Sequence, residues 1–358
     1  MDKTLIIGGG FSALIAKLLL AKQPAQIISA MTHPTALANT SDTTALERRP
    51  ALEINKLFCA QRAPSLGVLQ SQLTKGLLHD RLSHGGNSVI WGGFCNAAQL
   101  NPPAKAMLSA HGIDLVPLSF SQTGSASNVA GLSQLTQKDG RILNAAKLLG
   151  PSITDAYATQ LSVSNSGTLQ VSLWGQAQPL ECQRIILAVG TVQLIDLLYR
   201  SGIIVDGDIL TLTEFEHSLR LKPTLNAKPL SQQDCVIRYH PMRAIYHALG
   251  VQKMPKWLNH IPLPFYVDQT FYSQAQELQL HIAQGVLKVL PSSQNRQADF
   301  GGSIHYCNLR INGMNVNQLL ARFHPQLIAL GMPALTQMHP GPISNDIIND
   351  AALKIASL

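Results

Sequence analysis

Three small residues near the start of the chain have the spacing of a turn that binds dinucleotide phosphates. Gly8, Gly10 and Ala13 form the pattern G-x-G-x-x-A. In such a turn the first glycine permits a sharp bend, the second lets a pyrophosphate approach, and the small third residue lets a helix pack close to a strand. The phosphates then meet the free N–H groups and positive dipole end of that helix. The site would include Phe11 and Ser12.

The residues on either side of this turn have the patterns of a strand and a helix. Residues 4–7 are β-branched or apolar, which is typical of a buried strand. Apolar residues recur with helical spacing from Phe11 to Leu20. Strand, glycine turn and helix in that order are the context that a dinucleotide motif requires. The sequence therefore predicts an α/β fold that begins with a Rossmann-like domain.

One partner of this motif is missing from the sequence. Residues 25–30 are expected to form the second strand, whose end usually carries an Asp or Glu that binds the ribose hydroxyls. Residues 31–34 contain no acid, and the first one downstream is Asp42. They contain no Arg either, which a ribose 2′-phosphate would require. Either the ribose is held in another way or the nucleotide is bound more weakly.

A second group of glycines lies in the stretch RLSHGGNSVIWGGFCN at residues 81–96. Two glycine pairs, at 85–86 and 92–93, flank a small polar pair and an apolar triplet. Glycine at this density indicates a close approach of the backbone to a flat ligand or to another chain segment. A pair of tight turns is the other interpretation.

This stretch resembles the second flavin-binding motif of the glucose-methanol-choline (GMC) oxidoreductases. Gly85, Gly86, Ser88 and the pair 92–93 match positions of that motif, which runs alongside the flavin ring in the family. By the same resemblance Asn87 falls beside the ring. The resemblance implies FAD as the cofactor.

A third stretch also resembles this family. A hairpin is predicted at 156–173, and a strand at 182–188 leads into Gly190 and a helix that ends near Arg200. In the family the equivalent of this turn passes near the cofactor, so the resemblance places Gly190 at the flavin.

The end of the chain completes the resemblance. Residues 331–338 are expected to form a strand that returns to the flavin, and the final helix is expected to start near Gly341 and end near Ala356. The resemblance places Pro342 and Ile343 against FAD, where the helix dipole would stabilise the negative charge of the reduced flavin.

The resemblance implies the oxidation of an alcohol or a related C–H donor, with hydride moving to flavin N5. Residues 301–313 resemble the family's active-site segment, which makes His305 the candidate base. Imidazole suits this role because its charge changes near neutral pH. The second polar partner falls near Asn345, with His339 as a competitor and His84 as a weaker one. No G-x-S-x-G pattern is present, which disfavours a serine hydrolase.

The chain departs from the family at two further positions. Tyr306 stands in place of the second histidine of the family's pair, and residues 336–338 replace the acid expected near the ribityl chain. Each lost charged hydrogen bond weakens binding by roughly 1.5–3 kcal/mol. These departures predict a flavin that is bound loosely, held in an unusual way, or absent.

Three functions follow from these patterns. The favoured one is an FAD-dependent oxidoreductase that acts on a small or carrier-bound substrate, in a biosynthetic pathway. The second is a flavoprotein fold without a redox role, which carries out a cyclisation or elimination or serves as a partner subunit. The third is a nicotinamide-dependent enzyme that uses the first motif alone. The second glycine cluster argues against the third.

The predicted organisation is an FAD-binding domain interrupted by a substrate domain. Residues 1–203 and 301–358 would form the FAD-binding part, and 204–300 the substrate domain. The latter has short strand-like runs between prolines and polar loops, which indicates a smaller, mostly antiparallel sheet. Residues 97–150 are predicted to be rich in loops. The overall expectation is an α/β fold, α+β when both domains are counted.

The composition excludes several other classes. Of 358 residues 46% are apolar and 13% charged, and no run approaches the ~20 apolar residues of a membrane span. The net charge is +7, but the basic residues do not cluster, so no nucleic-acid partner is expected. The five cysteines are scattered without a Cys-x-x-Cys, which argues against disulfides and a metal site. Because the first strand begins near residue 4, we expect no signal peptide and a cytoplasmic location.

Overall fold

The structure is a computed structural model. It describes residues 3–20, 23–29, 70–71, 93–117, 128–217, 220–225, 236–242, 245, 255, 257–258, 261, 265–270, 273–291, 307–339 and 341–357. These residues form a parallel sheet, four further sheets and several helices, so the predicted α/β class is confirmed.

The parallel sheet contains the first strand of the chain. Its spatial order is β21 (Leu327–Ala329), β12 (Arg184–Leu187), β1 (Thr4–Ile7), β2 (Ala25–Ser29) and β8 (Ile153–Asp155). Every neighbouring pair is parallel. Numbered along the chain and taken from the β8 edge, the order is 3-2-1-4-5, which is that of the Rossmann fold. The predicted Rossmann-like arrangement is therefore present.

The residues of this sheet alternate between two cores. Leu5 and Ile7 point into one apolar cluster, whereas Ile6 between them points into the other, as the two-residue period of a strand requires. All three are at most 4% exposed. A strand that is apolar on both faces is typical of a parallel sheet covered on both sides.

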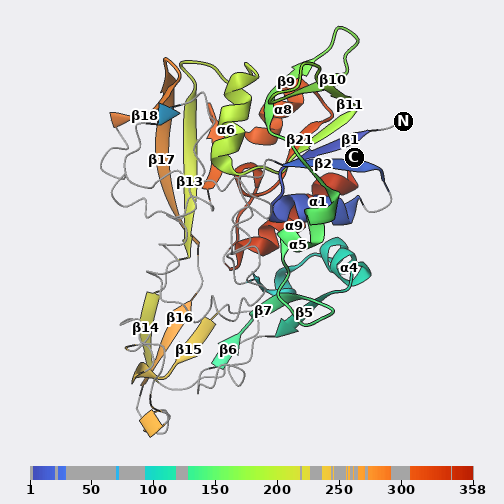
Figure 1. The fold of residues 1–358 in the computed structure, drawn as a ribbon. Helices are drawn as coiled ribbons and strands as arrows, with labels where there is room; N and C mark the ends of the chain where they lie inside the picture. Colours follow the sequence, from blue (N-terminus) through green and yellow to red (C-terminus); the bar gives the residue numbers. More distant parts are fainter. Residues whose placement is uncertain are drawn as a thin grey trace.

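Helices cover both faces of the sheet (Figure 1). One core holds residues of α1 (Phe11–Leu19), α4 (Pro102–Ala110), α5 (Ala145–Leu149) and α9 (Ile343–Ala356). The other holds residues of α6 (Thr191–Arg200) and α8 (Val316–Phe323). Three short 3₁₀ helices are η3 (Ala97–Gln99), η5 (Gly150–Ser152) and η9 (Met332–Ala334).

Two sheets pack on the α6 side, and all but one of their strand pairs are antiparallel. The predicted hairpin is confirmed as β9 (Ala158–Val163) and β10 (Leu169–Leu173), and β11 (Leu180–Cys182) pairs beside it. The second sheet has the order β20 (Met314–Asn315), β19 (Cys307–Ile311), β13 (Ile209–His217), β17 (Ser273–Ala283), β18 (Val286–Val289) and β3 (Gln70–Ser71). In Figure 1, α6 lies between these two sheets.

The other two antiparallel sheets lie in the lower half of Figure 1. One has the order β14 (Arg220–Leu225), β16 (Phe265–Thr270), β15 (Val236–Tyr239) and β6 (Asn128–Ala130). The other has the order β4 (Phe94–Cys95), β7 (Ser133–Gln137) and β5 (Ile113–Pro117). Residues 204–300 thus contribute mainly antiparallel strands, as expected.

The sheets are shared between distant parts of the chain. Strand β19 pairs with β13 in the six-stranded sheet, whereas β21, only 15 residues beyond the end of β19, joins the parallel sheet. The domain boundaries at 203 and 300 stay a prediction.

Two predicted features of the fold are wrong. Residues 331–338 do not form a strand, because Gly331 has a φ of +89° and Pro333 follows in the 3₁₀ helix η9. The strand that returns to the sheet is β21, just before them. The segment 97–150 is not rich in loops, since its described part holds α4, α5, β5 and β7.

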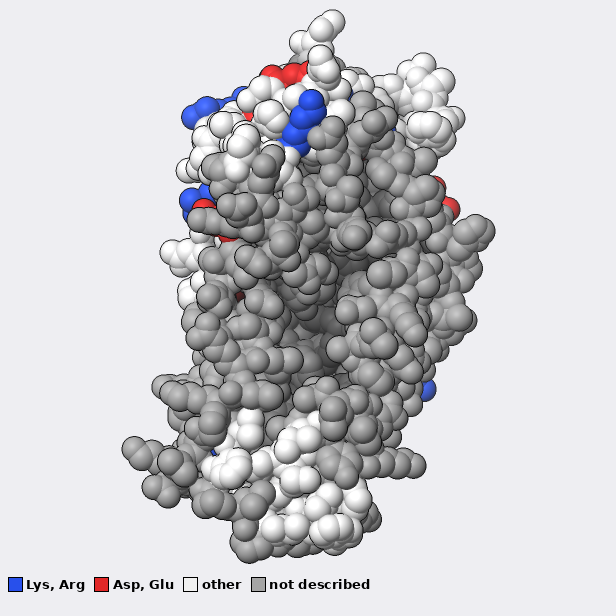
Figure 2. All heavy atoms as spheres, turned by 90° about the vertical axis from the view of Figure 1, so that its left-hand side faces the viewer, with Lys and Arg blue, Asp and Glu red and all other residues white. Residues whose placement is uncertain are grey.

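Figure 2 shows the face on the left side of Figure 1. On the described part of this face the charged residues gather mostly at the upper end, and they form no broad basic surface there. Among the described helices none is both long and apolar enough to cross a membrane.

Candidate functional site at the carboxyl edge of the parallel sheet

The loops that follow β1, β12 and β21 meet at one edge of the sheet. The strands are parallel, so their carboxyl ends lie together. The Ala188 N–H donates to the Ile7 oxygen at 2.8 Å, and the Leu330 N–H donates to the Leu187 oxygen at 2.8 Å. In sheets of this order, ligands bind outside the carboxyl ends at the point where the strand order reverses. Here that point lies between β1 and β12.

Gly8 is packed so closely that no other residue fits. Its φ is +125°, and its N–H donates to the Ile28 oxygen at 2.8 Å. A Cβ at this position would overlap the Ala188 carbonyl, with the carbonyl carbon only 2.6 Å away. The glycine therefore serves the junction between β1 and β12, as well as the turn that was predicted from its spacing.

Gly10 is the N-cap of α1, and it provides no side chain to satisfy the first N–H groups of that helix. Its backbone is extended, with φ −91° and ψ −164°. Helices α6 and α9 also lack a side-chain cap, with Gly190 and Pro342 at the N-cap. By contrast, α4, α5 and α8 are each capped by an asparagine side chain, from Asn101, Asn144 and Asn315.

The first turn of α1 lies against the loop after β21. A Cβ on Gly331 would overlap the Ser12 hydroxyl and lie 3.2 Å from its Cβ. Ala13 is fully buried and Phe11 is 7% exposed, so these two side chains pack into the core. The backbone N–H groups at the start of α1, and not the side chains of Phe11 and Ala13, are thus the groups that could bind an anion.

Asn345 links α9 to β4 through both ends of its amide. The Asn96 N–H donates to Asn345 Oδ1 at 2.8 Å, and Asn345 Nδ2 donates to the Asn96 oxygen at 2.7 Å. The preceding Ser344 hydroxyl donates to the Phe94 oxygen. Asn345 is 3% exposed. These bonds give its side chain a structural task, and its catalytic role stays a prediction.

His339 and Asp346 form a close pair at the start of α9. The distance between His339 Nδ1 and Asp346 Oδ1 is 2.7 Å, and the His339 backbone N–H donates to Asp346 Oδ2 at 2.9 Å. The side chain of His339 is 60% exposed and that of Asp346 only 5%. Burial raises the pKa of Asp346, while the hydrogen bonds and charge of His339 oppose that rise. Asp346 was not among the site residues predicted from the sequence, although an acid in the first turn of a helix is a recognisable signal.

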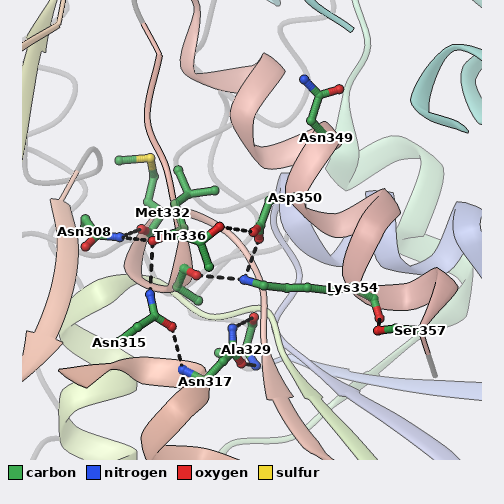
Figure 3. Close-up of polar contacts among 12 residues, drawn as sticks. Asn308, Asn315, Asn317, Ala329, Met332, Thr336, Asn349, Asp350, Lys354 and Ser357 are labelled. Carbon is green, nitrogen blue, oxygen red and sulfur yellow. Dashed lines mark hydrogen bonds and ion pairs between the residues drawn. The ribbon is translucent and has the colours of Figure 1, made fainter. Parts of the chain in front are cut away.

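A set of polar side chains holds the backbone of residues 332–335, just before His339 (Figure 3). Asn308 Nδ2 donates to the Leu335 oxygen at 2.7 Å, and Asn315 Nδ2 donates to the same oxygen at 3.2 Å. Lys354 Nζ donates to the Ala334 oxygen at 2.8 Å. The elements β19, β20 and α9 thus fix one short segment between them.

Lys354 also forms an ion pair with Asp350 one helical turn away. The Nζ–Oδ2 distance is 2.7 Å, and the side chains are 17% and 11% exposed. Burial lowers the pKa of Lys354 and raises that of Asp350, and each partner opposes the shift of the other. Thr336 adds a longer hydrogen bond, at 3.4 Å, to Asp350.

Several predicted site residues lie outside the described part of the chain. These are His305, the weaker candidate His84, and the flavin-motif residues Gly85, Gly86, Asn87 and Ser88. The described part does include Gly93, the last glycine of that motif, and β4 leads from it to the contact between Asn96 and Asn345. Among the described residues, no group of His, Cys, Asp or Glu could hold a metal ion.

Comparison with known proteins identifies no close relative. No family model matches the chain, and no curated protein matches it. Among solved structures, pyridoxine 4-oxidase from Mesorbium loti has a TM-score of 0.49 at 12% identity, over 100% of this chain and 99% of its own. OxyS anhydrotetracycline hydroxylase from Streptomyces rimosus has a TM-score of 0.30 at 12% identity, over 99% of this chain and 62% of its own.

A third structure is NikD, an unusual amino acid oxidase essential for nikkomycin biosynthesis. Its TM-score is 0.29 at 12% identity, over 99% of this chain and 95% of its own. Likenesses at this level carry no argument about activity, so a functional assignment depends on the chain's own residues.

Proposed function

We propose that this chain is an FAD-dependent oxidoreductase of GMC-like type that oxidises an alcohol or a related C–H donor. The observation that supports this most is the meeting of three loops at the carboxyl edge of a parallel sheet with the order 3-2-1-4-5. The turn at 8–10, the loop at 188–190 and the loop at 330–331 converge there. The crevice at this edge is where nucleotides bind in such sheets.

The described residues fit the phosphates of a dinucleotide. The N-terminus of α1 has no side-chain cap, because its N-cap residue is Gly10. The backbone N–H groups of Phe11, Ser12 and Ala13 would hold the pyrophosphate. The last residue of β2 is Ser29 instead of an acid, so the ribose would be bound without that carboxylate. FAD, when bound, would supply a two-electron acceptor for hydride.

The flavin would be bound by segments far apart in the sequence. We assign Gly190, Pro342 and Ile343 to this part of the site, together with Gly85, Gly86, Asn87 and Ser88. Support comes from α9, whose N-terminus carries no side-chain cap and is tied to β4, just beyond the second glycine motif. The positive end of α9 would favour negative charge on the reduced ring.

Two histidines are assigned to proton transfer. His305 is the proposed base, on the resemblance of its segment to the family's active site. His339 is the proposed second proton-transfer group. This assignment is supported by geometry, because the ring is mostly exposed while its Nδ1 atom lies within hydrogen-bond distance of Asp346. Asn345 would then act by fixing the start of α9, through its two bonds to Asn96.

The proposed activity is tested by spectroscopy on purified protein loaded with FAD. We expect flavin absorbance in the visible range, and loss of that absorbance when a small or carrier-bound alcohol is added without oxygen. Loss of this bleaching in His305→Gln and His339→Gln, with flavin still bound, would support the two assignments.

Two other results would favour the alternative functions. Substrate conversion with no change in flavin absorbance would favour non-redox chemistry, such as a cyclisation or elimination. Binding of NADH or NADPH, measured by fluorescence, without binding of FAD would favour a nicotinamide enzyme.

A further inference from the structure

Both oxygens of the buried Asp346 carboxylate contact the same residue, His339. Oδ1 lies 2.7 Å from His339 Nδ1, and Oδ2 accepts the His339 backbone N–H at 2.9 Å. Two contacts to the same residue fix the ring relative to its own backbone, whereas one would leave it free to rotate. The carboxylate is 5% exposed, so water competes little for these bonds.

The position of Asp346 in α9 favours the ionised carboxylate. It lies in the first turn of a helix of 14 residues, where the helix dipole stabilises negative charge. Burial raises its pKa and is the largest influence, while the hydrogen bonds and charge of His339 act in the opposite direction. Among the residues that the structure describes, His339 is the one titratable residue that influences the pKa of Asp346 in this way.

The other charged groups near α9 are engaged elsewhere or lie on other helices. On α9 itself Asp350 and Lys354 pair with each other at 2.7 Å. Of the elements packed against α9, α1 carries Lys17, α4 carries Lys105, and β4 carries no charged residue. Among the described residues neither lysine forms an ion pair with Asp346, which leaves His339 as its partner.

An ionised carboxylate can only accept hydrogen bonds, so the ring nitrogen that faces it must carry a hydrogen. In neutral imidazole the other nitrogen then has a free lone pair. Among the described residues His339 Nε2 has no hydrogen-bond partner, and the ring is 60% exposed. Nε2 is thus the atom available to a substrate.

We infer that Asp346 is a positioning residue, which keeps the ring hydrogen of His339 on Nδ1 and leaves Nε2 to accept a proton, as the second proton-transfer group beside the proposed base His305. The role of Nε2 rests on the proposed function. The placement of the ring hydrogen is a property of the protein alone and can be measured without flavin or substrate. When Nε2 takes a proton, the positive ring would be stabilised by the carboxylate 2.7 Å from Nδ1.

The ring hydrogen can be located directly in the wild-type protein by ¹⁵N NMR of labelled histidines. The His339 signals are assigned by their loss in His339→Gln. We expect the neutral ring to carry its hydrogen on Nδ1, and Nε2 to take up the proton on titration. A neutral ring with its hydrogen on Nε2 would overturn the inference, because Asp346 would then be the donor.

Two matched variants separate positioning from a purely structural role. In Asp346→Asn the neutral ring of His339 should become a mixture of the two tautomers, since an amide can donate as well as accept a hydrogen bond and no longer requires the ring hydrogen on Nδ1. Asp350→Asn removes the same charge one turn further along the helix and should leave the His339 signals unchanged. Equal effects of the two variants, or no effect of either, would contradict the inference.

Kinetics of the FAD-loaded protein provide a separate readout. In Asp346→Asn the pH dependence of the flavin bleaching rate should differ from that of the wild type, because the negative charge beside His339 Nδ1 is lost. If the protein binds no flavin, the proposed function fails while the NMR result still decides the role of Asp346. If Asp346→Asn does not fold, the tautomer of the wild-type ring remains the deciding measurement.

Discussion

At the scale of single residues, Gly8 shows that the first glycine of the motif serves the fold directly. Its positive φ and its contact with the Ala188 carbonyl are both set by the packing of β1 against β12. The residue is therefore required whether or not a nucleotide is bound. Gly10 differs, because any residue can adopt its extended backbone conformation. Its proposed role depends only on the absence of a side chain at the N-terminus of α1.

Gly8→Ala should lower the free energy of unfolding by about 3 kcal/mol, because a strained φ and a backbone overlap act together. The control is Gly207→Ala, at φ +97° with no atom within 4 Å of the added Cβ. That variant should lose only about 1 kcal/mol, from backbone strain alone. Urea denaturation measures both. Equal losses would show that the contact with Ala188 contributes nothing.

At the scale of elements, the described residues between β21 and α9, 330–339 and 341–342, have no regular structure beyond η9 and are held by side chains from neighbouring elements. Asn308, Asn315 and Lys354 donate to carbonyl oxygens of this segment. The segment connects Gly331, which packs on Ser12, with His339. The position of the proposed proton-transfer group thus depends on elements that do not touch a cofactor.

Lys354→Met should lower the free energy of unfolding by about 3 kcal/mol. It leaves Asp350 buried without its cation, and breaking such a pair costs more than the pair contributes. It also removes the hydrogen bond to the Ala334 oxygen.

Lys105→Met on α4 is the matched control, because Lys105 is exposed and its loss should change stability by less than about 0.5 kcal/mol. Thermal and urea unfolding of both variants would measure the difference. A Lys354→Met protein as stable as the wild type would show that the pair does not hold this segment.

At the scale of the whole molecule, the parts of the fold predicted from sequence are those with strong local patterns. The strand, turn and helix at 4–19, the hairpin at 158–173 and the helices α6 and α9 were expected and are present. Short elements were missed. The pair Asn101-Pro102, an N-cap followed by proline, is a signal that could have identified α4.

The assembly of the site could not be read from local patterns. Asn96 and Asn345 are 249 residues apart, and their contact depends on how α9 packs beside β4. The strand predicted at 331–338 was wrong because its apolar residues are buried by packing against neighbouring elements and not by pairing in a sheet. Sequence spacing therefore indicated the groups at the site, while tertiary contacts decide which of them meet.

The central claim, an FAD site at the N-terminus of α1, is tested most directly by titration with FAD on three proteins. These are the wild type, Gly10→Asn and Gly10→Asp. Both substitutions suit an N-cap and the extended backbone, so both should fold at least as stably as the wild type. They differ by one negative charge where the pyrophosphate would lie.

We predict that the wild type binds FAD, and that Gly10→Asp binds it at least about tenfold more weakly than Gly10→Asn, because the carboxylate repels the phosphates. Absence of FAD binding by the wild type, or equal affinities of all three proteins, would contradict the claim.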